Sequence, residues 1–178
     1  MLSNLSWCLL AIATSAVSAA NLSTSITYAF TISDFQGHML DLTNGNNHQL
    51  TPVQSFTPAN TTNQQWALIS TQDARQLWEL FNLGSNTMMS HTTAMLKRKG
   101  TAIHAQIVGS NETLFWRLDN SPEGSRFTDA STGLALTAWS AEEGYPSSPL
   151  TLEYASGENK RQIFHLHCMK AWSIPGDC

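Results

Sequence analysis

Apolar and polar residues alternate over short stretches along most of the chain, as they do in half-buried β-strands. The stretch 26–32, Ile-Thr-Tyr-Ala-Phe-Thr-Ile, is typical and rich in residues that favour strands. No stretch after residue 20 shows sustained helical periodicity with capping residues. The same pattern predicts further strands at residues 38–42, 50–56, 65–69, 77–81, 87–91, 94–97, 102–108, 115–118, 125–128, 132–137, 150–154 and 163–166.

One short motif recurs along this pattern with a long period. Asn63-Gln64-Gln65-Trp66 has weaker copies at Leu114-Phe115-Trp116 and Gln162-Ile163-Phe164, so the rings are spaced by 50 and then 48 residues. Repeats of this length are single supersecondary units that cannot bury an apolar face alone. About a dozen strands in three such units predict a closed, threefold, all-β structure with one shared core.

Composition narrows the class of protein. The chain has 178 residues, enough for one domain with a core, and 42% of them are hydrophobic. Charged residues make up only 12%, about half the usual share, and Ser, Thr, Asn and Gln supply the polarity instead. The net charge is −4, and the basic run at 97–99 is too short to indicate nucleic-acid binding.

The first twenty residues read as a secretory signal peptide. Leu9–Ala13 lies in an apolar stretch too short to span a bilayer, and Val17–Ala20 supplies small residues for cleavage. No Lys or Arg precedes the apolar stretch, which departs from the usual pattern. We therefore expect residues 1–20 to be removed and residues 21–178 to form a secreted domain.

Cysteines and glycosylation motifs agree with secretion. Cys8 leaves with the signal peptide, and the remaining pair, Cys168 and Cys178, is expected to form a disulfide in an oxidising compartment. Acceptor motifs for N-linked glycans begin at Asn21, Asn60 and Asn111. In a chain rich in Ser, Thr and Asn, such motifs also arise by chance.

Two segments of the first unit, Gly37–Gly45 and Asn63–Trp66, resemble the repeat of the ricin-B-type lectins, particularly the small fungal members. The resemblance covers the mature chain as a pattern and is specific only in the first unit. It implies a β-trefoil of three roughly 45–50-residue repeats and an activity of carbohydrate binding. It also implies core rings braced by glutamines, which here are Gln64, Trp66, Trp116, Gln162 and Phe164.

The resemblance also implies a sugar site in the first unit. A pyranose needs a carboxylate and amides for its hydroxyls and an aromatic ring under its C–H patch. The family positions for these groups fall on Asp41, Gln54, Phe56, Asn63 and Gln64. Phe56 replaces the more usual Trp or Tyr, which should weaken stacking, and a glycan on Asn60 would crowd the pocket.

Both key residues also have structural interpretations. Asp41 could cap the turn at Asn44-Gly45, and Phe56 could be an ordinary inward strand residue. Galactose-type sugars are the commonest ligands of the family, but one carboxylate and two amides do not fix which hydroxyls are read.

The other two units lack the family's site residues. In the second, the Asp position falls near Met89-Ser90, the stacking position on Gln106, and Thr113-Leu114 replaces the amide pair. In the third, Thr137 stands for Asp, Glu153 for the aromatic residue, and Arg161-Gln162 for the amide pair. We expect no family-type site in either unit.

Nothing in the sequence indicates an enzyme, a cofactor or a metal site. His165 and His167 alternate along one strand, but no third ligand is spaced nearby and Cys168 is assigned to the disulfide. The expected partners are glycans or glycoproteins, with a possible homodimer and no membrane insertion. Two rival functions share the fold: a protease inhibitor acting through loop 119–124 or 142–149, and a degenerate trefoil that binds a protein.

Overall fold

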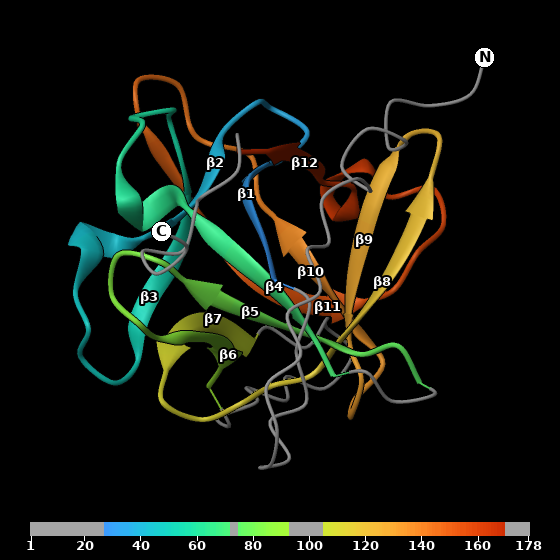
Figure 1. Ribbon diagram of the computed structural model, residues 1–178. Helices are drawn as coiled ribbons and strands as arrows, with labels where there is room; N and C mark the ends of the chain where they lie inside the picture. The colour runs from blue at the N-terminus through green and yellow to red at the C-terminus, as the bar shows by residue number, and fades with distance from the viewer. Residues whose placement is uncertain (1–26, 72–74, 93–104, 170–178) are drawn as a thin grey trace, which may run out of the picture.

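The computed structural model describes residues 27–71, 75–92 and 105–169, and these are almost entirely strands and turns (Figure 1). The first unit contains β1 (Thr27–Ser33), β2 (Met39–Leu42), β3 (Thr51–Phe56) and β4 (Trp66–Ser70). The later strands are β5 (Trp78–Asn82), β6 (Met88–His91), β7 (Ala105–Ser110), β8 (Trp116–Ser121), β9 (Gly124–Asp129), β10 (Leu134–Ala138), β11 (Ser147–Tyr154) and β12 (His165–Cys168). Three single-turn 3-10 helices complete the fold, η2 (Thr43–Gly45), η3 (Thr62–Gln64) and η4 (Lys160–Gln162).

These strands form one antiparallel sheet that closes on itself. The order along the sheet is β10-β9-β8-β5-β4-β1-β2-β3-β11-β7-β6, and β12 pairs with β1. Additional pairings join β10 to β11, β5 to β6 and β3 to β7, which removes most free edges. Within the described residues, no helix is long and apolar enough to cross a membrane.

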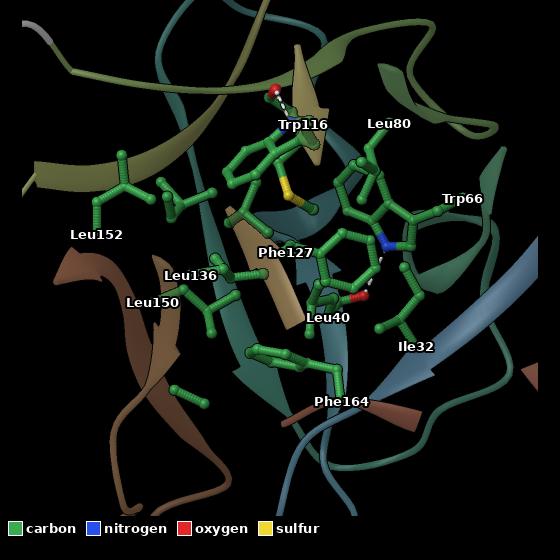
Figure 2. Packing of buried hydrophobic residues seen from close by; sticks show 14 of the residues in the cluster. Ile32, Leu40, Trp66, Leu80, Trp116, Phe127, Leu136, Leu150, Leu152 and Phe164 are labelled. Atoms are coloured by element: carbon green, nitrogen blue, oxygen red, sulfur yellow. Dashed lines mark hydrogen bonds between the residues drawn. The ribbon is translucent and has the colours of Figure 1, made fainter. Parts of the chain in front are cut away.

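One core holds the three rings that mark the sequence period. Trp66, Trp116 and Phe164 are fully buried, and Figure 2 shows their side chains converging with Phe127. The ring of Phe127 meets Trp116 edge-on at 6.5 Å and Phe164 at 6.0 Å between centroids. The expectation of one shared core is therefore confirmed.

The buried indole groups are also satisfied as hydrogen-bond donors. Trp66 Nε1 donates to the Leu40 carbonyl at 2.9 Å, and Trp116 Nε1 donates to the Met89 carbonyl at 3.4 Å. The first bond joins β4 to β2, and the second joins β8 to β6. Leu40 and Met89 therefore occupy equivalent places in the first and second units.

Most predicted strands are found within one to three residues of their expected bounds, and two of the differences are informative. β11 begins at Ser147 rather than residue 150, because Ser147–Pro149 pair with β3 although their sequence does not favour a strand. β12 begins at His165 rather than residue 163, because Phe164 forms an isolated bridge with Ser125. The strand expected at 94–97 lies outside the described residues.

One candidate inhibitor loop is not a protruding loop. Residues 119–121 belong to β8 and pair with β9, and Ser121 lies opposite Gly124. The turn between them is therefore only two residues long, Pro122-Glu123. The other candidate loop is shorter than expected, since residues 147–149 belong to β11.

Candidate functional site

The polar residues predicted for the first unit form one hydrogen-bonded cluster around Asp41. Asp41 lies in β2 directly opposite Gln54 in β3, and its side chain is buried, with only 3% of the residue exposed. Asp41 Oδ1 accepts from Gln54 Nε2 at 3.2 Å. Asp41 Oδ2 accepts from Asn63 Nδ2 at 2.7 Å and from Gln64 Nε2 at 3.0 Å. Three amides therefore converge on one carboxylate.

The loop after β3 brings Asn63 and Gln64 to that carboxylate. Gln64 Nε2 also donates to the Thr57 carbonyl at 3.0 Å, and its Oε1 accepts from the Ala59 amide at 2.9 Å. The 3-10 turn η3 closes this loop through a bond from the Gln64 amide to the Thr61 carbonyl at 3.1 Å. Gln64 is thus a buried brace that fixes both the loop and the cluster.

Phe56 lies at the end of β3, on the same side of the strand as Gln54. Val53 and Ser55 are buried on the core side, whereas Gln54 and Phe56 are half-buried. The ring is therefore beside the amide cluster at the surface and is not an inward strand residue. Asp41 does not cap the turn at residues 44–45, since both of its oxygens bind amides of other segments.

The groups of the cluster that solvent can reach are the amides and the ring, not the carboxylate that the sequence suggested as the hydroxyl acceptor. Asp41 is almost completely covered, while Gln54 and Asn63 remain half-exposed. The two amides and the ring are therefore the groups nearest to solvent. Of the three bonds to the carboxylate, the contact from Gln54 at 3.2 Å is the longest.

Comparison with known proteins shows which family this part of the chain resembles. Residues 21–106 match the model of the ricin-type β-trefoil lectin domain-like family. This segment is similar to a ricin-type β-trefoil lectin domain. The matched segment contains every residue of the Asp41 cluster. No curated protein matches the chain by sequence.

Solved structures share the fold of this lectin-like domain over most of its length. The Rhizoctonia solani agglutinin has a TM-score of 0.69 at 17% identity, covering 87% of this chain and 100% of its own. The ricin B-like lectin of Macrolepiota procera, solved with lactose, scores 0.63 at 18% identity, with 78% and 93% covered. A mutant of the earthworm lectin C-terminal domain, solved with 6'-sialyllactose, scores 0.56 at 14% identity, with 80% and 99% covered.

The third unit of the lectin-like domain keeps the glutamine brace without the carboxylate. Gln162 Nε2 donates to Thr137 Oγ1 at 3.1 Å and to the Tyr154 carbonyl at 2.9 Å, and its Oε1 accepts from the Ser156 amide at 2.9 Å. These bonds repeat those of Gln64. Thr137 takes the place of Asp41, so a hydroxyl stands where the first unit has a charge.

In the second unit, Ser90 takes the place of Asp41 because Met89 is equivalent to Leu40. Ser90 lies opposite Val108, and Met88 lies opposite Ser110. Ser110 therefore occupies the position of Phe56, and the sequence assignment of that position to Gln106 is wrong. The register of β6 and β7, which spacing from the motif did not reveal, accounts for the difference.

Sequence reasoning missed a second set of buried polar side chains. Each of these residues lies at the end of a strand and is buried. Asp34 directly follows β1, Asn82 is the last residue of β5, and Asp129 is the last residue of β9. Each accepts backbone amides of the turn that follows, for example Gly84 N and Ser85 N on Asn82 Oδ1, both at 3.1 Å. Their spacing of 48 and 47 residues matches the ring period, which is the signal that would have found them.

The remaining candidate residues fall in less informative places. His165 and His167 are exposed on β12, and His167 Nε2 lies 2.8 Å from Ser33 Oγ. Among the residues described, no group of three His, Cys, Asp or Glu side chains could hold a metal ion. Cys168 is exposed on β12, while Cys178 and Asn21 lie outside the described residues. Asn60 and Asn111 are both exposed.

Proposed function

We propose that this chain is a secreted carbohydrate-binding protein with one sugar site in the first repeat, formed by Asp41, Gln54, Phe56, Asn63 and Gln64. The observation that carries the proposal is the convergence of three amides on the Asp41 carboxylate beside the half-exposed ring of Phe56. The family match and the sugars in two similar structures support it.

In the proposed complex, the sugar lies over Phe56 and the half-exposed amides. Each amide has a carbonyl oxygen and a second N–H available for ligand hydroxyls while the other N–H is held by Asp41. The buried carboxylate fixes the direction of both amides before the ligand arrives, which lowers the entropy lost on binding. One shallow site with a Phe ring typically gives a millimolar Kd, about −4 kcal/mol.

We also propose how the mature protein is organised, processed and modified. Three repeats of roughly 45–50 residues make up a β-trefoil at 21–178, after a signal peptide at 1–20. A disulfide joins Cys168 to Cys178, and glycans are attached at Asn21, Asn60 and Asn111. The domain is not an enzyme, and its partners are glycans or glycoproteins carrying galactose-type sugars. A homodimer would raise avidity, since a single weak site needs multivalency for useful binding.

The test is a glycan array with the secreted, enzymatically deglycosylated protein and three variants. Asp41→Ala and Phe56→Ala should each lose binding, whereas Phe115→Ala, which removes an exposed ring outside the proposed site, should retain it. Two site variants are needed because Asp41 also braces the fold. Binding that survives both site variants would refute the residue assignment, and no binding by folded wild type would refute the function.

A further inference from the structure

A second pocket lies away from the Asp41 cluster. It has a volume of about 440 Å³ and is lined by Phe35, Glu123, Glu158, Lys160, Ile163 and His165, with Gly157 at its rim. These residues come from the turn after β1, the β8–β9 turn, the loop before η4 and the start of β12. In Figure 1 the β8–β9 hairpin and the β3 strand that carries Gln54 lie on opposite sides of the molecule.

The walls of this pocket are held in place by hydrogen bonds. Arg126 Nη2 donates to the carbonyls of Ser156 at 2.9 Å and Gly157 at 3.3 Å, which fixes the loop before η4. Gln162 Oε1 accepts from the Ser156 amide at 2.9 Å and holds the same loop from the core side. The pocket is therefore formed by a braced loop, which favours binding without a large ordering cost.

A glycine allows the opposite wall to approach closely. Gly124 has a φ of +138°, and a Cβ there would lie 2.7 Å from both Ile163 Cγ2 and the Phe164 carbonyl oxygen. The β8–β9 hairpin can therefore lie directly against the start of β12, where Ser125 N donates to the Phe164 carbonyl at 2.8 Å. This contact places Glu123 beside Ile163 and His165.

The lining favours an uncharged polar ligand. A ligand of either charge meets a like-charged group, since two carboxylates stand with an ammonium group. A metal ion finds no set of three ligands among the residues described. A wholly apolar ligand would contact Phe35 and Ile163 but would make no use of the exposed polar groups of Glu123, Glu158, Lys160 and His165.

A neutral, hydroxyl-rich ring can contact both the apolar and the polar groups of the lining. The half-buried Phe35 and Ile163 offer an apolar surface for ring C–H groups. The two carboxylates accept hydroxyl protons, and Lys160 and the imidazole of His165 supply donors. The volume of about 440 Å³ lies within the range of roughly 300–1,000 Å³ found for small-molecule sites.

We propose that this pocket is a second saccharide site, which takes a single neutral pyranose unit and shares no residue with the Asp41 cluster. The inference goes beyond the proposed function, because it concerns a different surface and a different residue set. It makes each chain bivalent. Two weak sites facing different directions would bridge two glycans without a homodimer.

The experiment follows backbone amide signals of ¹⁵N-labelled, deglycosylated full-length protein during titration with methyl β-galactoside, methyl α-mannoside and N-acetylglucosamine. At least one of these probes should shift the amides of Gly124, Gly157 and Glu158 with a millimolar constant. The double variant Glu123→Gln/Glu158→Gln should weaken that binding at least about tenfold, because a neutral amide accepts hydroxyl protons less strongly than a carboxylate. Lys160→Ala should weaken it in the same direction.

Two comparisons separate this inference from the proposed function. The matched control Glu142→Gln/Glu143→Gln removes the same charge from an exposed loop and should leave the titration unchanged. Asp41→Ala should abolish shifts near Asn63 and leave those at Gly157. The proposal is overturned if no probe shifts the pocket amides, if the double variant binds as wild type does, or if Asp41→Ala removes the pocket shifts as well.

Discussion

Asp41 has a structural role that the sequence alone does not reveal. Only 3% of the residue is exposed, and burial of a charge is costly unless it is hydrogen-bonded. Three side-chain amides from β3 and η3 supply those bonds. The residue that resembles a sugar ligand in the sequence is therefore also the anchor of the loop after β3.

Asp41→Ala should destabilise the protein as well as remove the proposed site. The substitution removes the acceptor of one N–H each of Gln54, Asn63 and Gln64, although Gln64 keeps its bond to the Thr57 carbonyl. The typical cost is about 1–3 kcal/mol in the free energy of unfolding. Urea denaturation followed by tryptophan fluorescence would measure the loss. Glu143→Ala, at an exposed position, is the control. A midpoint equal to that of wild type would show that Asp41 is not a brace.

Glu79 gives a prediction for the pH dependence of stability. Burial raises the pKa of the Glu79 carboxyl above its ordinary value of 4.5. The folded state therefore holds this proton more tightly than the unfolded state, and the stability from this group is lost as pH rises from 4.5 through the raised pKa.

Replacing Glu79 should therefore help at neutral pH. Glu79→Gln should raise the urea midpoint at pH 7, and the difference from wild type should vanish below pH 4.5, where both states of the wild type are protonated. The exposed residue Glu143, changed to Gln, should show no such divergence. A difference that is the same at both pH values would contradict the assigned cause.

At the scale of the element, the turns depend on buried side chains as much as on turn residues. Asn82 closes β5 and holds the following turn through Gly84 N and Ser85 N, each at 3.1 Å. Its Nδ2 reaches back to the Asn63 carbonyl at 2.9 Å, so it also links β5 to the loop that carries the candidate site.

Asn82→Ala should loosen both the turn and the candidate site. The loss of several buried hydrogen bonds should lower the free energy of unfolding by about 1–3 kcal/mol. Amide hydrogen exchange should accelerate at Gly84 and Ser85 and, through the lost bond to its carbonyl, around Asn63. Asn46→Ala, at an exposed position, should change neither quantity. Unchanged exchange around Asn63 would show that the two segments are independent.

The alternation of apolar and polar residues predicted where the strands lie better than it predicted which strands pair. Alternation identified β1 to within one residue, because half-buried and buried positions alternate from Ala29 to Ile32. The pairing of Ser147–Pro149 with β3 had no local signal, since it depends on the closure of the sheet. Asp41 and Gln54, which are 13 residues apart, lie opposite each other because one hairpin joins β2 to β3.

The rest of the site needed tertiary structure. The burial of Asp41 results from a 3-10 turn that carries Asn63 and Gln64 over it, and 3-10 turns leave little trace in a hydrophobic pattern. The second pocket brings together residues such as Phe35 and Glu158 from segments more than a hundred positions apart. No spacing rule within one repeat could place them side by side.

At the scale of the whole molecule, the core makes the three units interdependent. The ring of Phe127 lies between Trp116 and Phe164, and Trp66 closes the same cluster from the first unit (Figure 2). A cavity at any of these rings removes contacts that belong to more than one unit. The chain should therefore unfold in one transition, as small single domains usually do.

Phe164→Ala tests this interdependence. Truncation of a fully buried Phe typically costs about 3–5 kcal/mol, because the surrounding side chains collapse only partly into the space. The urea transition should move to lower concentration but stay single. Tryptophan fluorescence, which reports Trp66, Trp78, Trp116 and Trp139 together, should coincide with far-ultraviolet circular dichroism. Phe115→Ala, at a ring 39% exposed, should move it far less. If the fluorescence and circular dichroism midpoints of the variant separated, the units would unfold in more than one step, and the shared core would not couple them.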